Sequence, residues 1–175
     1  MADVSDLLAG PSSTWALDAA RTTVGFRSPS FWGLVKVKGT FTKVEGTGQA
    51  TAPDLAGGHL RIDAASLSTG IGKRDDHLRS ADFFEVDKHP TIGVTLDKAV
   101  VTGPGSLELN TTIMIKGIEH RLDLPATVTV LDGGAVRLVT KAELNRQEFG
   151  VRGNLVGMMG DITTVEATAV FVKQS

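Results

Sequence analysis

Apolar and polar side chains alternate along most of this chain, and this period of two limits the possible folds more than any other feature. In residues 35–41, for example, Val35, Val37 and Phe41 share one face, and two lysines lie on the other. Such alternation is typical of half-buried β-strands. We expect strands at 35–41, 59–64, 92–96, 107–115, 122–130, 136–144 and 165–172, with shorter ones near 15–17 and 24–26.

Segments that contain glycine or proline separate these runs. Residues 28–34 break the alternation with Pro29 and Gly33, which predicts an interruption of the strand there. Asp132 and the two glycines after it predict a tight hairpin. Further turns are predicted at 45–48, 56–58 and 102–105.

The apolar faces of alternating strands must meet, and a sandwich or a closed barrel allows this. Mostly short turns favour an up-and-down order of the strands. A barrel of eight strands has an interior just wide enough for side chains or for one small ligand. We therefore predict an all-β protein, an eight-stranded antiparallel up-and-down β-barrel with an N-terminal tail at residues 1–12, a barrel domain at 13–175 and a short helical insert around residues 72–85.

Composition narrows the possible functions. The net charge of −2 is spread over both signs, so no nucleic-acid-binding surface is expected. The chain has no cysteine, which removes disulfides, thiol nucleophiles and cysteine-based zinc sites. Its first residues carry neither a basic group nor a long apolar run, and no window is apolar enough to cross a membrane. We expect a cytoplasmic protein with no signal peptide, no integral membrane segment and no cofactor.

Residues 69–90 depart from the strand pattern. Basic and acidic residues come first, two phenylalanines follow, and a proline ends the segment. A charged and then aromatic insert in a chain of strands is where we first look for function. Two interpretations remain open: the insert contacts a ligand, or its ion pairs and rings merely fix it to the barrel.

The run RDDHLRSADFFEVDKHP at 74–90 resembles the signature of the YceI-like family, bacterial polyisoprenoid-binding proteins with a lipocalin-like barrel. The resemblance extends over nearly the whole chain. Trp15–Asp18 is similar to the family's opening strand, Lys116–His120 to the centre of one of its hairpins, and Leu144–Gly150 to its late R-x-x-F-G turn. The chain differs at 28–30, near which the family often carries a histidine.

The resemblance implies a barrel that binds, sequesters or transports a long-chain isoprenoid, such as a polyprenyl diphosphate or a quinone-like lipid, in an apolar lumen. An isoprenoid or other long-chain lipid is therefore the expected partner, and the sequence leaves open whether the protein is a monomer or a homodimer. Burial of hydrocarbon is worth about 0.8 kcal/mol per CH₂ group, so length and shape suffice for binding. The same apolar residues would equally form a filled core, as in a structural or stress-response module.

Alternation and the insert together select the residues expected to line the lumen. Lys73, Arg74 and Arg79 form the densest cationic cluster, and we predict them as head-group candidates because such groups bind phosphate. The predicted ligand-binding residues of the lumen are Trp15, Leu17, Phe26, Val37, Phe41, Ile62, Phe83, Phe84, Ile92, Val94, Leu109, Ile113, Leu124, Val128, Leu138, Ala142, Ala167 and Phe171.

Other chemistry has less support in the sequence. His77 and His89 stand twelve residues apart, which is no recognised metal-ligand spacing, so we predict no metal site. Gly70–Lys73 lacks the first glycine and the Ser or Thr of a phosphate-binding loop. The chain has no nucleophile elbow, and we predict no catalytic residues and no enzyme. The alternative is an enzyme acting on an isoprenoid or lipid substrate, with a site assembled across strands.

Overall fold

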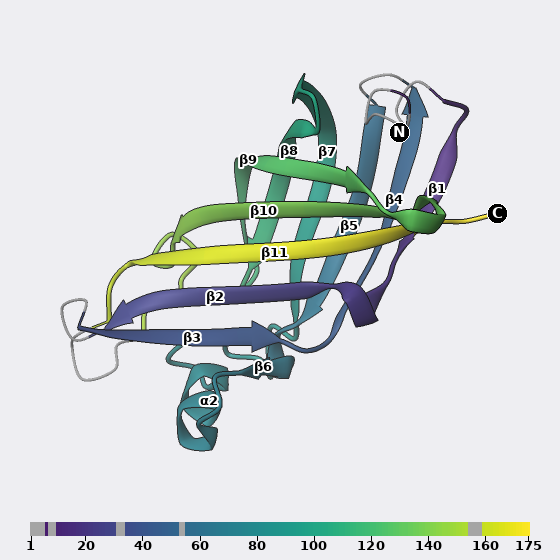
Figure 1. Ribbon diagram of the computed structural model, residues 1–175. Helices are drawn as coiled ribbons and strands as arrows, with labels where there is room; N and C mark the ends of the chain where they lie inside the picture. The colour runs from purple at the N-terminus through teal and green to yellow at the C-terminus, as the bar shows by residue number, and fades with distance from the viewer. Residues whose placement is uncertain (1–5, 7–9, 31–33, 53–54, 154–158) are drawn as a thin grey trace.

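The computed structural model describes residues 6, 10–30, 34–52, 55–153 and 159–175. Strands dominate it, and they form one antiparallel sheet (Figure 1). The helical elements include α2 Gly72–Arg79 and the short 3-10 turns η1 Ala19–Arg21, η3 Ala64–Ser66 and η4 Asp132–Gly134. The strands are β1 Ser13–Leu17, β2 Thr23–Ser30, β3 Val35–Phe41, β4 Val44–Ala52, β5 Leu55–Asp63, β6 Leu67–Ser68, β7 Thr91–Gly103, β8 Ser106–Ile115, β9 Ile118–Val130, β10 Val136–Asn145 and β11 Ile162–Lys173.

The sheet closes into a barrel through β1, which pairs with β4 on one edge and with β11 on the other. From β4 to β11 the barrel strands follow the chain, so that each pairs with the next. The described residues thus form a closed eight-stranded antiparallel barrel, in which β1 with β2, and β3 with β4, each count as one bent strand. This confirms the predicted fold class.

The bends in these two strands separate the β2–β3 pair from the neighbouring strand β5 at one side of the barrel. β1 ends and β2 begins on either side of η1, where the amides of Ala20 and Arg21 donate to the carboxylate of Asp18. β3 gives way to β4 at residues 42–43, and before that bend β3 pairs with β2 and β6, not with β5. The β2–β3 pair therefore diverges from β5, and the segment from β6 through α2 lies on that side (Figure 1).

Helix α2 is shorter than the insert predicted around residues 72–85. It ends at Arg79, and the chain then forms turns as far as residue 88. The amide of Phe84 donates to the carbonyl of Leu78 at 3.0 Å, which satisfies an acceptor left free at the helix end. The turn carries Phe83 into the interior, where its ring is fully buried. Burial of that ring offsets the loss of a further helical turn.

Two predicted turns are wrong, since residues 45–48 and 56–58 lie inside β4 and β5. A Cβ atom at Gly46 would lie only 2.9 Å from the carbonyl oxygen of His59, so this glycine permits a close approach of the two strands. β2 also runs through Pro29, contrary to the predicted interruption. The proline is tolerated because it lies beyond the last β2–β11 pair, where no ladder amide is needed.

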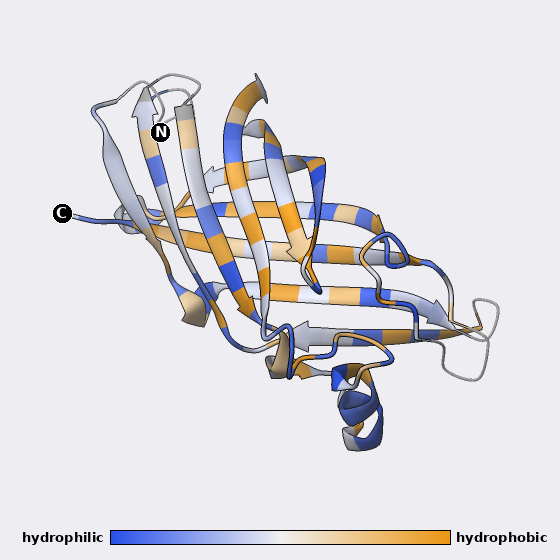
Figure 2. Ribbon diagram, turned by 180° about the vertical axis from the view of Figure 1, so that it is seen from behind, coloured by the Kyte–Doolittle hydropathy of each residue, from blue (hydrophilic) through white to orange (hydrophobic). Residues whose placement is uncertain are grey.

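Hydropathy alternates along the barrel strands, whereas α2 is almost entirely hydrophilic (Figure 2). Buried apolar side chains form three groups inside the barrel, around Leu109 with Leu124, around Ile62 with Ile92, and around Phe83. Among the described residues, no helix is long and apolar enough to cross a membrane.

Candidate functional site

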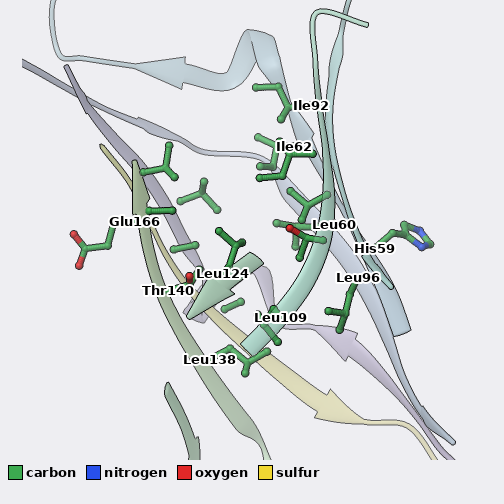
Figure 3. Close-up of a pocket in the computed structure, with 18 of the residues that line it drawn as sticks. His59, Leu60, Ile62, Ile92, Leu96, Leu109, Leu124, Leu138, Thr140 and Glu166 are labelled. Carbon is green, nitrogen blue, oxygen red and sulfur yellow. The ribbon is translucent and has the colours of Figure 1, made fainter. Parts of the chain in front are cut away.

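The barrel surrounds a cavity of about 350 Å³, to which all of its strands contribute lining residues. Ile62, Ile92 and Leu124 point into the cavity, whereas the side chains of His59 and Glu166 point away from it (Figure 3). These directions follow from the pairing: Ile62 and Ile92 are direct partners across β5 and β7, so they share a face. The volume lies at the lower end of the roughly 300–1,000 Å³ range of small-molecule sites.

The cavity wall contains every residue predicted to line the lumen except Leu17 and Val37. Val37 is buried opposite Ser28, and Leu17 is half-buried opposite Phe171, but neither borders the cavity. The predicted residues that do border it are Trp15, Phe26, Phe41, Ile62, Phe83, Phe84, Ile92, Val94, Leu109, Ile113, Leu124, Val128, Leu138, Ala142, Ala167 and Phe171. Their position is established, and their contact with a ligand stays a prediction.

Sequence reasoning missed part of the wall. Gly48 and Gly58 also border the cavity as direct partners on β4 and β5, and residues without a side chain give no hydropathy signal. Other missed residues lie on the same alternating faces as predicted ones, so a stricter use of the period would have found them. These are Val24, Leu60, Leu96, Leu107, Ile115, Val136, Leu144, Val165 and Ala169. Ala99 also borders the cavity, but the irregularity between Leu96 and Lys98 shifts β7 out of the period of two, so alternation alone would not have found it.

Few polar side chains face the cavity, and their hydrogen bonds lie within the protein. The hydroxyls of Thr111 and Thr140 each donate to a backbone carbonyl of β9, at 2.7 and 2.8 Å. The hydroxyls of Ser28 and Thr163 bond to each other at 2.7 Å. Within the part of the chain that the structure describes, no buried side-chain nitrogen or oxygen lacks a partner. The cavity therefore offers a ligand mainly apolar contacts.

Arg146 borders the cavity and is only 5% exposed. Burial lowers the pKa of its guanidinium, against the opposing effect of Asp161, yet an arginine remains charged at neutral pH. The nearest carboxylate oxygen, Oδ1 of Asp161, lies 3.8 Å from Nη2. The guanidinium donates to four backbone carbonyls, those of Gly160 (from Nε, 2.8 Å), Val151 and Gly153 (from Nη1, 2.8 and 2.6 Å) and Met159 (from Nη2, 3.1 Å).

Three stretches that resemble family motifs meet at one end of the cavity, which we call the α2 end. Leu78 and Phe83 of the insert pack in one buried group with Phe149 of the R-x-x-F-G turn, and all three border the cavity. Lys116, in the tight β8–β9 turn, donates to one carbonyl of the insert at 3.4 Å and to one carbonyl after Phe149 at 3.1 Å. The α2 end is thus held by both packing and polar contacts.

The predicted head-group candidates Lys73, Arg74 and Arg79 do not border the cavity. Arg74 donates to the hydroxyl and the carbonyl of Thr69, at 2.8 and 3.0 Å. Arg79 donates to two carbonyls within 65–67, at 2.9 and 2.8 Å, while Lys73 is exposed on α2. The two arginines therefore fix α2 to the chain that precedes it. A head-group role for the three residues stays a prediction.

Asp75 completes this attachment of α2. Its Oδ1 accepts hydrogen bonds from both the amide and the hydroxyl of Thr69. Burial of Asp75 disfavours its ionised form, but the bonds from Thr69 and the charges of Arg79 and Arg74 outweigh this effect. The pKa of Asp75 therefore lies below its usual value. The carboxylate is ionised at neutral pH, where it stabilises the start of the helix.

The histidines of the insert have separate surroundings. Nε2 of His77 lies 3.0 Å from a carboxylate oxygen of Asp82, and the His77 ring contacts the edge of Phe83. His89 lies instead beside Gly117 in the β8–β9 turn. Within the described ranges, no three His, Asp or Glu side chains gather as a metal site would require.

Residues 15–171 match the family model described as the YceI-like domain. The chain belongs to the YceI-like family. This confirms the resemblance seen in the sequence.

Curated relatives of this YceI-like chain are UPF0312 proteins. One from Ectopseudomonas mendocina is 30% identical over 91 residues, which cover 51% of this chain and 48% of the relative. One from Vibrio cholerae is 30% identical over 87 residues, covering 49% and 46%. One from Pseudomonas savastanoi pv. phaseolicola is 25% identical over 131 residues, covering 71% and 68%. The chain spans about half the length of the first two relatives.

Solved structures share the barrel at lower identity. Burkholderia cenocepacia BcnA superposes with a TM-score of 0.80 at 20% identity, covering 88% of this chain and 98% of BcnA. A polyisoprenoid binding domain from Saccharophagus degradans, implicated in plant cell wall breakdown, gives 0.75 at 17% identity, covering 90% and 97%. The Campylobacter jejuni YceI protein gives 0.69 at 20% identity, covering 81% and 87%. At these identities the likeness shows the fold.

Proposed function

We propose that this YceI-like protein binds a long-chain isoprenoid, or another lipid with a long apolar chain, inside its barrel. The observation that carries the proposal is the cavity of about 350 Å³, whose wall consists mainly of aliphatic and aromatic side chains. Such a wall offers water few hydrogen bonds and offers hydrocarbon many contacts. A lipid chain is therefore the ligand class that the cavity accommodates best.

The energetics are sufficient without special chemistry in the lumen. Each buried CH₂ group contributes about 0.8 kcal/mol, so ten such groups contribute roughly 8 kcal/mol before the costs of association. Those costs are about 4–15 kcal/mol, so useful affinity requires a longer chain or a specific head-group contact. The volume suits a chain of moderate length, or a longer one that is partly outside the cavity.

One further consideration supports this proposal. The Saccharophagus degradans neighbour, which has the same fold, is described as a polyisoprenoid binding domain, so isoprenoids are the first ligands to test. Sequestration or transport of the lipid, in the cytoplasm, is the role that we propose for the complex. A monomer or a homodimer would serve equally, because each barrel has its own cavity.

Native mass spectrometry of protein purified from its own host tests the proposal. The expected result is a co-purifying mass of several hundred daltons, or uptake of an added isoprenoid by the bare protein. Ala167→Trp, which places a large ring in the cavity, should reduce uptake at least about tenfold while the fold persists. Thr168→Trp is the matched control on the same strand, because Thr168 alternates with cavity-lining neighbours and faces outward.

Two results would overturn the proposal. Uptake by Ala167→Trp equal to that of the wild type would show that the lipid does not occupy this cavity. A bare mass together with no uptake of any long-chain lipid would show a cavity without this function. Conversion of the added lipid to a product would instead establish an enzyme that acts on it.

A further inference from the structure

The hydroxyl pair of Ser28 and Thr163 contains a hydrogen for which the described residues supply no acceptor. Both residues border the cavity, and their oxygen atoms lie 2.7 Å apart. Two hydroxyls carry two hydrogens, and the single bond between them uses one. The inward hydroxyls of Thr111 and Thr140 already donate to carbonyls of β9. Among the inward-facing side chains that the structure describes, this pair is where a hydroxyl hydrogen remains for a ligand.

We propose that the Ser28–Thr163 pair is the head-group site of the lumen, and that it selects a neutral carbonyl oxygen, as in a quinone, an ester or an aldehyde, over a diphosphate. The inference rests on the proposed function and adds the position and the chemistry of the head group. A carbonyl oxygen accepts the remaining hydrogen without bringing a charge into the cavity. Because Ser28 is only 2% exposed and Thr163 is half-buried, that bond is partly shielded from competing water.

A diphosphate would find few partners for its charges among the described residues of the cavity wall. Its charges would lose their hydration and would need cationic donors in return. Arg146 is the one lysine or arginine among the described lining residues, and four of its N–H groups already donate to backbone carbonyls. Lys73, Arg74 and Arg79 lie outside the wall. A diphosphate head group, with a single and mostly engaged cation to meet it, is therefore disfavoured in the interior relative to a neutral oxygen.

The position of the pair also sets the direction of the ligand. Thr163 is the direct partner of Leu144, which packs in the buried group of the α2 end with Phe83 and Phe149. The far wall, around Trp15, Gly48 and Phe171, is apolar. The head group thus lies toward the α2 end, and the isoprenoid tail extends toward Trp15.

Three C20 isoprenoids that share one chain separate the head-group effect from the tail effect: geranylgeranial, geranylgeranyl diphosphate and the hydrocarbon without a head group. Binding is measured by titration of the full chain, below the concentration at which each lipid aggregates. The wild type should bind the aldehyde about fivefold more tightly than the hydrocarbon, as one net hydrogen bond implies. It should bind the diphosphate at least about tenfold more weakly than the aldehyde.

The double variant Ser28→Ala/Thr163→Val tests the pair itself. Removal of both hydroxyls together leaves no unsatisfied partner, so the fold should persist, which circular dichroism checks. The preference for the aldehyde over the hydrocarbon should disappear, while the affinity for the hydrocarbon stays unchanged. Thr163→Val alone leaves the Ser28 hydroxyl free to donate and should retain the preference. Thr112→Val, which removes an outward hydroxyl of β8, is the matched control.

The outcomes separate this inference from the proposed function. Equal affinity for aldehyde and diphosphate in the wild type overturns the inference, and so does an aldehyde preference that survives in the double variant. In both cases isoprenoid binding itself stands. If none of the three lipids binds the wild type, the proposed function fails and the inference fails with it.

Discussion

The α2 end and the cavity wall are stabilised in different ways. At the α2 end, named polar groups meet specific partners: Arg146 contacts four carbonyls, Arg79 contacts two, and Lys116 joins the insert to the turn after Phe149. Along the wall, aliphatic side chains such as Leu109 contact one another without directed bonds. The stability of the α2 end therefore depends on which residue stands at each position. The stability of the cavity wall depends mainly on the size of each side chain and on the alternation of apolar and polar residues.

This difference explains why family recognition and ligand binding involve different residues. The runs that resemble the family, in the insert and around Arg146, converge on the α2 end, where few other side chains could make the same bonds. Most residues of the wall carry no comparable signature, because another apolar side chain of similar volume would serve there. A strong sequence signature therefore marks the end of the cavity more than the surface that a ligand touches.

The largest expected effect comes from Arg146→Met, which leaves four carbonyls at the α2 end without their donor. We expect the free energy of unfolding to fall by about 3–5 kcal/mol, since buried polar groups lose their partners. Urea denaturation would show this as a lower midpoint at an unchanged slope. Arg152→Met is the matched control, because Arg152 is exposed and should change stability by less than about 0.5 kcal/mol. Equal effects of the two variants would contradict the central role of Arg146.

A smaller loss of stability is expected when a glycine is replaced by alanine. This loss should be larger at the α2 end than on the cavity wall. At Gly153 a Cβ atom would collide with the carbonyl oxygen of Asp82 and lie 2.7 Å from the Phe83 ring. At Gly48, on the cavity wall, the nearest heavy atom would be 3.7 Å away. Gly153→Ala should therefore cost about 1–3 kcal/mol, and Gly48→Ala less than about 0.5 kcal/mol. Thermal unfolding of both variants measures the difference, and similar midpoints would contradict it.

The smallest expected effect is a dependence of folding stability on pH, which arises from Asp75 in α2. Because the folded-state pKa of Asp75 is lowered, its contribution to stability is complete above the unfolded pKa of about 3.9 and is lost as pH falls through the folded value. Asp75→Asn should therefore reduce stability by about 1 kcal/mol at pH 7. The difference between the variant and the wild type should shrink progressively as pH falls below the unfolded pKa of about 3.9, as urea midpoints at a series of pH values would show. A constant difference across that range would refute the role of the ionised carboxylate.

Much of the wall could be predicted because side-chain direction in a strand is a local property. Ile62, Ile92 and Leu124 face the cavity as their alternation predicted. Glycine often marks a turn, but Gly46 in β4 instead permits the close approach of two strands, so the turn predicted there is wrong. The head-group candidates on α2 were selected by charge alone, and charge does not reveal whether a guanidinium is already bonded to a carbonyl, as that of Arg79 is.

The sequence by itself determined the period of two, the closed barrel as its solution, and the family. The period is a property of residues that are close together in the chain, and the barrel follows because the apolar faces of the strands must be buried against one another. Only the tertiary structure decided how β1 closes the ring, how Arg146 donates to the carbonyls of Val151, Gly153, Met159 and Gly160, and that Ser28 meets Thr163 across 135 residues. Such contacts depend on the register between distant strands, which no local pattern encodes.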